Sequence, residues 1–198
     1  MDADDWNTRY DTSELIWHAE PNQFVRDELA ELAPGTGLDV ACGEGRNAIW
    51  LTGRGWAMTA IDFSARAIEK GEALAAQQDV DVTFLVADAT TYAPDTTFDL
   101  VLSCYLQLPE PDRSAALARA RDAVAPGGTL LLVAHDRSNL DEGHGGPPHP
   151  AVLPVAEEVV SALEGFVIEQ AGVVDRVVET DDGPRVAKDT LVRARRPA

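Results

Sequence analysis

The stretch that decides the fold is Leu38-Asp39-Val40-Ala41-Cys42-Gly43-Glu44-Gly45-Arg46-Asn47-Ala48. Its first residues are mostly apolar, as in a buried parallel strand, and an amphipathic pattern typical of a helix begins at its end. The two glycines lie between them, where glycine permits a tight turn and lets the backbone approach a ligand closely. The N–H groups at the start of the helix are free to bind that ligand. The stretch therefore predicts a ligand-binding loop between a strand and a helix.

Short apolar runs alternate with amphipathic stretches along the chain, which favours βαβ units and a parallel sheet. The expected strands are residues 37–41, 56–61, 82–86, 98–102 and 129–134. The expected helices begin near Pro21 and then cover about 46–54, 64–78, 109–124 and 154–163. The β-rich runs 166–178 and 186–195 flank an Asp-Gly turn, which predicts an antiparallel hairpin. The pattern thus indicates an α/β protein of five parallel strands and a final hairpin, with residues 1–20 irregular.

A chain of 198 residues fits one domain. We expect it to comprise an N-terminal cap segment and helix (1–33), a cofactor-binding core (34–135), a substrate lid loop (136–153) and a C-terminal helix with the hairpin (154–198). The lid is expected because connections of that length in compact domains are often binding loops.

The charge of the chain restricts its partners. Lys and Arg number 16 and Asp and Glu 34, which gives a net charge of −18. Phosphates attract basic residues, so this excess of acids opposes binding to nucleic acid or to an anionic membrane. Two cysteines are too few for a disulfide framework or a Cys-rich zinc site, and we expect no metal. Residues 1–6 lack the apolar core of a signal peptide, and no apolar run spans a bilayer, so we expect a cytoplasmic protein.

Acidic residues accompany the ends of the first three expected strands. Asp62 closes the second strand, where a carboxylate can accept hydrogen bonds from both ribose hydroxyls. Asp39 lies just ahead of the glycines, where it would repel a pyrophosphate and attract a cationic amine. Asp88 follows the third strand, where it can read an adenine amino group. The three acids therefore favour a cationic nucleoside over a dinucleotide.

In this combination and order, the residues resemble the class I S-adenosylmethionine-dependent methyltransferases. The segments that carry the resemblance are 38–45, Asp62, Asp88, Phe98-Asp99-Leu100-Val101 and Pro126-Gly127-Gly128. It covers about Leu32 to Arg195 and implies a Rossmann-like three-layer α/β/α sandwich. The sheet would be seven-stranded and mostly parallel, with an antiparallel C-terminal hairpin strand. Within the family, the chain is similar to the small-molecule group of tellurite-resistance and thiopurine methyltransferases.

The resemblance implies S-adenosylmethionine as the cofactor and a small molecule as the methyl acceptor. It places Asp39 near the amino end of the cofactor's methionine part, Asp62 at the ribose, and Phe63 at the adenine. The candidate cofactor-binding residues are Asp39, Ala41, Gly43, Gly45, Asn47, Asp62, Phe63, Asp88, Ala89 and Ser103. We leave the oligomeric state open.

His135 and Tyr105 are the candidate catalytic residues. His135 ends the fifth strand, at the edge of the sheet where the cofactor is expected, and histidine can act as a base near neutral pH. Tyr105 lies just past the fourth strand, where it can orient the acceptor. Methyl transfer needs mainly proximity and alignment, so no strong catalytic dyad has to be visible in the sequence. We expect transfer to an oxygen, sulfur or chalcogen nucleophile.

Aromatic residues near the N-terminus and histidines elsewhere are less informative. Trp6, Tyr10 and Trp17 could cover the cofactor or pack on the sheet, and His18 is either a surface residue or part of a lid. His144 and His149 have a spacing that matches no standard metal motif.

Two other functions stay open. Residues 43–48 also fit the pattern G-x-G-x-x-G/A, so an NAD(P)-dependent oxidoreductase is an alternative. The other is a non-catalytic nucleoside-binding module that acts through a protein partner and binds the cofactor without turnover.

Overall fold

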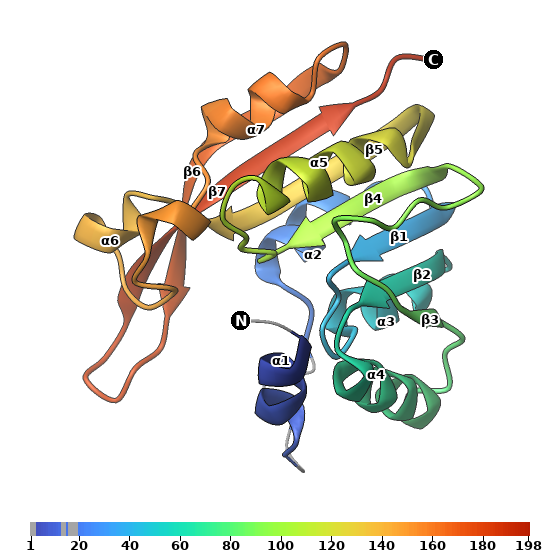
Figure 1. Ribbon diagram of the computed structural model, residues 1–198, viewed down its shortest axis with the longest axis horizontal. Coiled ribbons are helices and arrows are strands. Elements are labelled where there is room, and N and C mark those ends of the chain that lie inside the picture. The colour runs from blue at the N-terminus through green and yellow to red at the C-terminus, as the bar shows by residue number, and fades with distance from the viewer. Residues whose placement is uncertain (1–2, 13–14, 16–19) are drawn as a thin grey trace.

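The structure is a computed structural model that describes residues 3–12, 15 and 20–198, so Trp17 and His18 lie outside the described residues. Within this part of the chain, seven strands form one sheet: β1 (Thr36–Val40), β2 (Ala57–Asp62), β3 (Thr83–Val86), β4 (Phe98–Cys104), β5 (Val124–His135), β6 (Val167–Val178) and β7 (Arg185–Arg195). Their order is β3-β2-β1-β4-β5-β7-β6 (Figure 1). The strands β1 to β5 are parallel, and β7 is antiparallel to both β5 and β6. The predicted sheet is therefore confirmed.

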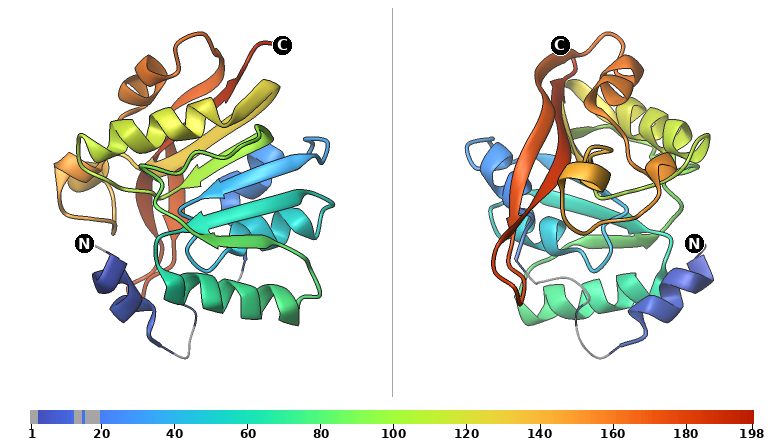
Figure 2. Two further views of the ribbon diagram at one scale, coloured as in Figure 1. Left: turned by 45° about the vertical axis from the view of Figure 1, so that its right-hand side comes forward. Right: turned by 90° about the vertical axis from the view of Figure 1, so that its left-hand side faces the viewer.

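Helices cover both faces of the sheet (Figure 2). One apolar core lies between the sheet and the helices α2 (Gln23–Leu29), α3 (Arg46–Thr52) and α4 (Ala65–Gln77). The other lies between the sheet and the helices α5 (Asp112–Asp122) and α7 (Ala156–Ala162). The expected three-layer α/β/α architecture is confirmed. Among the described residues, no helix combines the length and the apolarity that a membrane span requires.

The N-terminal segment differs from its prediction, because Ala3–Tyr10 form helix α1 where irregular chain was expected. The Asn7 side-chain oxygen accepts hydrogen bonds from Ser64 Oγ at 2.7 Å and from the Arg66 amide at 3.3 Å. The Trp6 and Tyr10 rings stack with centroids 5.6 Å apart. An eight-residue helix is marginal in water by itself. The hydrogen bonds of Asn7 with the start of α4 therefore stabilise α1. Its sequence pattern alone is too weak to reveal it.

The segment 136–153 is also more ordered than expected, since it contains α6 (Asn139–Glu142) and a 3-10 turn, Pro150–Val152. Two of its polar side chains bind β7. Thr190 Oγ1 donates to Asp136 Oδ2 at 2.6 Å, and the Lys188 amide donates to Asn139 Oδ1 at 2.7 Å. The beginning of this segment is therefore fixed to the hairpin, and its glycine-rich part projects from that anchor.

Ser64 links α1 to α4, because its hydroxyl accepts from the Ala67 amide at 3.1 Å and donates to the Asn7 side-chain oxygen at 2.7 Å. We expect Ser64→Ala to lower the free energy of unfolding by about 1 kcal/mol through the lost helix cap. The melting temperature should fall by roughly 2–4 °C. Ser161→Ala, which removes an exposed hydroxyl bonded within α7, is the matched control and should stay within about 0.5 kcal/mol of wild type. Equal losses in both variants would contradict the capping role.

Candidate functional site

The parallel pairing of the strands brings the candidate residues to one edge of the sheet. Val40, at the end of β1, is in register with Ile61 on β2 and with Ser103 on β4. The loop that follows β1 is held across the edge by the Cys42 amide, which donates to the Ile61 carbonyl at 2.9 Å. The candidates that follow β2, β3, β4 and β5 therefore lie along the same carboxyl edge as the glycine loop.

The glycine loop has a backbone that few residues other than glycine adopt. Gly43 has φ 57° and Gly45 has φ 77°, and Ala41 also has a positive φ of 57°. Non-glycine residues in this region store strain, which tends to occur at functional sites. A Cβ atom on Gly45 would come 2.6 Å from Phe84 Cε1, so this glycine is also needed for the packing of β3 against the loop.

Asp62 holds the loop in place. Its Oδ2 accepts a hydrogen bond from the Gly43 amide at 2.9 Å, and its Oδ1 accepts one from the Ser64 amide at 2.9 Å. Burial raises the pKa of this carboxyl, while the two amides oppose the rise. Each carboxylate oxygen keeps a second lone pair, so Asp62 can bind the loop and a ligand hydroxyl together. Glu44, between the two glycines, forms a largely buried ion pair with Lys70 on α4.

Asp39 lies beneath the glycine loop without such support. Its side chain is 1% exposed, and no described residue donates a hydrogen bond to either of its oxygens. Burial raises its pKa to about 7, against the opposing effects of the nearby Ala48 amide, which is not aligned as a hydrogen bond, and of the charge of Arg46. A buried carboxylate without a partner is costly unless a cation or donor reaches it. Asp39 is therefore prepared for a positively charged ligand group.

The other candidate cofactor residues have mixed environments. The Asn47 oxygen accepts from the Asn22 amide at 2.9 Å, which ties α3 to the segment before α2. Asp88 is exposed, and its Oδ1 accepts from the Thr90 amide at 2.8 Å in a local turn. Ala89 is buried, and Phe63 is half-buried directly after Asp62.

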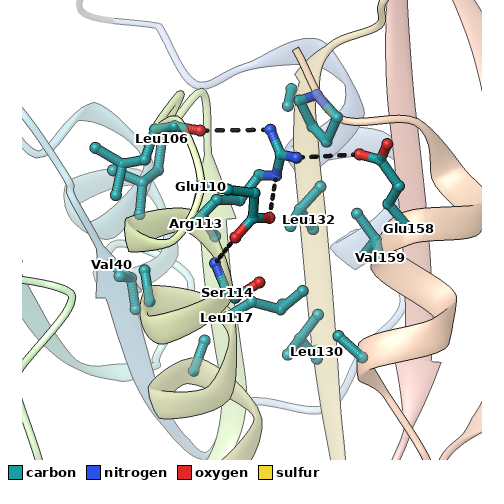
Figure 3. Close-up of a pocket in the computed structure, with 17 residues that line it drawn as sticks. Val40, Leu106, Glu110, Arg113, Ser114, Leu117, Leu130, Leu132, Glu158 and Val159 are labelled. Atoms are coloured by element: carbon teal, nitrogen blue, oxygen red, sulfur yellow. Dashed lines mark hydrogen bonds and ion pairs between the residues drawn. The ribbon is translucent and has the colours of Figure 1, made fainter. Parts of the chain in front are cut away.

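Ser103 is separated from the glycine loop, because it lines an apolar cavity of about 60 Å³ between the sheet and the helices α5 and α7. Figure 3 shows Arg113 at this cavity, between Glu110 and Glu158 and beside apolar side chains. Arg113 Nε lies 3.2 Å from Glu110 Oε1, and its Nη2 lies 3.2 Å from Glu158 Oε2. None of the other candidate site residues lines this cavity. Ser103 is thus on the edge but opens to the opposite layer.

The two candidate catalytic residues are in contact. The Tyr105 and His135 rings have centroids 4.9 Å apart. Both also approach Asp189 on β7, which is fully buried: Tyr105 O–H donates to its Oδ2 at 2.8 Å, and His135 Nδ1 lies 3.0 Å from its Oδ1. Arg176 on β6 donates from Nε to the same Oδ2 at 2.7 Å. A histidine beside a buried carboxylate is an arrangement suited to general base chemistry.

Asp189 and Arg176 were not among the residues predicted from the sequence. A signal for Asp189 exists, since it lies two residues from Ala187 and from Leu191, which are both apolar and buried on the same face of the strand. A charged residue at an inward position of a strand requires a partner. Its partners come from the distant β4, β5 and β6, so the sequence by itself does not identify them.

Comparisons with known proteins agree with this geometry. Residues 38–128 match a family model described as a methyltransferase domain. The chain is 35% identical to 27-O-demethylrifamycin SV methyltransferase of Amycolatopsis mediterranei over 121 residues, which are 57% of this chain and 44% of the relative. It is 32% identical to an uncharacterized methyltransferase of Mycobacterium tuberculosis over 129 residues, 64% of each. The matches span less than two thirds of these curated relatives.

Solved structures with the same fold include an N-methyltransferase and TehB. One is NodS, an N-methyltransferase from Bradyrhizobium japonicum in complex with S-adenosyl-L-homocysteine. Its TM-score is 0.75 at 19% identity, and the superposition covers 100% of this chain and 100% of NodS. TehB from Haemophilus influenzae has a TM-score of 0.75 at 18% identity, with 98% of this chain and 66% of that chain covered. At such identities the likeness concerns the fold. It agrees with the fold that the class I resemblance implies, and this predicted fold is confirmed.

The raised pKa of Asp39 predicts how the stability of the ligand-free protein depends on pH. Because it is raised from 3.8 to about 7, its contribution to stability is present at low pH and is lost as the pH rises through about 7. Above that pH the buried charge costs up to about 4 kcal/mol. Asp39→Asn removes the charge, so the variant should resist urea better than wild type at about pH 8, and its advantage should shrink at about pH 5. An advantage that is equal at both pH values contradicts the burial of an ionised Asp39.

Proposed function

We propose that this chain, which has the class I methyltransferase fold and a methyltransferase domain over residues 38–128, is an S-adenosylmethionine-dependent enzyme that methylates a small molecule. The acceptor atom in this proposal is oxygen, sulfur or another chalcogen. The observation on which the proposal depends is the buried, unpartnered carboxylate of Asp39 below the glycine loop. A cationic amine would supply both the charge and the hydrogen bond that this carboxylate lacks, and S-adenosylmethionine has one.

The residues of the carboxyl edge fit the cofactor. Asp39 would bind the ammonium group, and the free lone pairs of Asp62 would accept from the ribose hydroxyls. The backbone at Ala41, Gly43 and Gly45, which has positive φ, would approach the methionine part. Phe63 would flank the adenine. The remaining residues of the proposed cofactor site are Asn47, Asp88 and Ala89. Ser103, also predicted from the sequence, lies at the same edge, but its position in the cavity beside α5 and α7 does not support a role in this site.

A pyrophosphate fits this edge poorly. Asp39 and Asp62 are both buried next to the glycine loop, and the loop carries Glu44 between its glycines. Two negative groups close to a bound diphosphate would repel it, in contrast to their effect on a sulfonium and an ammonium. The charge arrangement thus favours S-adenosylmethionine over NAD(P).

The chemistry proposed for the chain's own residues is the removal of a proton. When bound, S-adenosylmethionine supplies a methyl carbon activated by positive sulfur, whose bonding electrons return to sulfur to leave S-adenosylhomocysteine. His135 would take the proton of the acceptor, and Tyr105 would orient the acceptor beside it. The acceptor's freed electron pair then forms the new bond to carbon. Such base assistance contributes about 10²–10⁴-fold to a rate.

A hydroxyl-bearing acceptor has the best support. A protonated hydroxyl is a weak nucleophile, so it gains most from a base such as His135. The name of the Amycolatopsis relative also describes methylation at an oxygen. Thiols and chalcogen oxyanions belong to the same proposal, and a screen that measures release of S-adenosylhomocysteine distinguishes among them.

Asp39→Asn tests the cofactor site by affinity. Loss of the charged hydrogen bond should weaken binding of S-adenosylhomocysteine by about 1.5–3 kcal/mol, or roughly 10- to 150-fold, in calorimetric titration. Asp99→Asn is the matched control, because Asp99 binds Thr36 at the opposite end of β1 and its replacement should leave the affinity unchanged. Binding of NADH in place of S-adenosylhomocysteine would favour the oxidoreductase and overturn the proposal.

His135→Gln tests the base. We expect the turnover number for a hydroxyl acceptor to fall by about 10²–10⁴-fold, and the acidic limb of the pH–rate profile to disappear. Affinity for S-adenosylhomocysteine should stay at the wild-type value, which serves as the control for folding. An unchanged rate and profile would remove His135 from the mechanism, and binding without turnover of any acceptor would favour a non-catalytic module.

A further inference from the structure

The side chain of Asp189 is the meeting point of four strands. It projects from β7, and the groups that approach it come from the ends of β4 and β5 and from β6. His135 and Asp189 face each other in the register between β5 and β7. Both are two residues from members of the core on the α2 and α3 side, Val133 and Leu191, so they share that face of the sheet. Asp189 is therefore inside the site, although it lies far from the glycine loop in sequence.

The two oxygens of Asp189 have different partners. Oδ2 accepts from Tyr105 O–H at 2.8 Å and from Arg176 Nε at 2.7 Å. Oδ1 has His135 Nδ1 at 3.0 Å. The two atoms are not aligned as a hydrogen bond, and among the described residues neither this oxygen nor this nitrogen has a hydrogen-bond partner. Nδ1 of His135 is thus the group that faces the unused oxygen of Asp189.

The hydrogen-bond partners of Asp189 indicate which groups around it carry a proton. Burial raises the pKa of Tyr105 well above its ordinary value, so its hydroxyl keeps its proton and donates. Arg176 is always a donor. Burial alone would raise the pKa of Asp189, but His135, Arg176 and Tyr105 outweigh it and lower that pKa. An ionised carboxylate only accepts, so the nitrogen that faces Oδ1 must hold a proton.

The ring of His135 is also confined by the glycine-rich part of the segment 136–153. Gly146, in the glycine-rich part of the segment 136–153, has φ 77°, and a Cβ atom there would come 2.9 Å from Cδ2 of the ring. Asn139 supports this turn by donating to the Gly145 carbonyl at 2.8 Å. The imidazole thus packs against both this turn and the Tyr105 ring, which limits its freedom to turn over.

We propose that Asp189 is a positioning residue, which keeps the proton of His135 on Nδ1 so that Nε2 is free to act as the base. Tyr105 and Arg176 orient Asp189 for this task. The inference rests on the proposed function of His135. In the reaction the acceptor's O–H bond breaks, its proton joins Nε2, and its electron pair forms the bond to the methyl carbon. The resulting imidazolium is stabilised by the Asp189 carboxylate and later gives its proton to solvent.

Asp189→Asn has a definite expected effect. The donors Tyr105 O–H and Arg176 Nε–H keep the amide oxygen on their side, so the amide NH2 faces His135. Nδ1 must then accept a hydrogen bond, and the proton moves to Nε2. The nearly isosteric replacement therefore inverts the tautomer of His135 and blocks the base.

The primary experiment is a long-range 1H–15N correlation spectrum of the imidazoles in 15N-labelled protein, with His135 assigned by its loss in His135→Gln. We expect the neutral ring to carry its proton on Nδ1 in wild type and on Nε2 in Asp189→Asn. Asp175→Asn is the matched control, because Asp175 is exposed on the same hairpin, where Lys188 Nζ binds it at 2.7 Å, and this variant should retain the wild-type tautomer. A wild-type proton on Nε2 overturns the proposal even if Asp189→Asn does not fold. An unchanged tautomer in a folded Asp189→Asn also overturns it.

Activity provides a second readout. With phenol, which must lose a proton, Asp189→Asn should release S-adenosylhomocysteine at least tenfold more slowly than wild type. With iodide, which has no proton, the two should be equal. Equal losses with both acceptors mean a merely structural role and overturn the proposal. If wild type turns over no acceptor, the proposed function fails, and the tautomer measurement still decides the role of Asp189.

Discussion

A carboxylate that is buried in protein must receive hydrogen bonds or positive charge, and this requirement organises the carboxyl edge of the sheet. Asp62 meets it with two backbone amides, and in doing so it fixes the glycine loop to β2 and α4. Asp189 meets it with the side chains of three other strands. Asp39 receives no hydrogen bond from the described residues, so its compensation is left to a ligand. Asp39, the acid of these three that receives no hydrogen bond, thus marks the expected position of the ligand.

The reversed hairpin gives the site its second half. Because β7 runs antiparallel to β5, the middle of β7 is placed beside the end of β5, and Asp189 meets His135 there. Strand β6 then brings Arg176 to the same carboxylate. The segment 136–153 is anchored to this hairpin through Asp136 and covers the histidine. In the proposed enzyme, acceptor chemistry and cofactor binding would therefore depend on different parts of one sheet edge.

The sequence predicted the strands and most helices because period and turn signals are local. The Asp-Gly turn and two β-rich runs were enough to predict the hairpin, and Ser64 was enough to cap α4. Helix α1 was missed because its stability comes from contacts with residues more than fifty positions away. Asn47 and Asp88 were predicted from motif position, which does not reveal that each already has an intramolecular hydrogen bond.

By itself, the sequence determined the parallel α/β fold, the glycine loop and the row of acids at its strand ends, because strand alternation and motif spacing are properties of adjacent residues. It also made His135 and Tyr105 candidate catalytic residues, since the ends of parallel strands can be predicted from the sequence pattern. Only the tertiary structure decided that both contact Asp189 and that Arg176 joins them. Those contacts depend on strand order and register, which bring together residues that no local pattern connects.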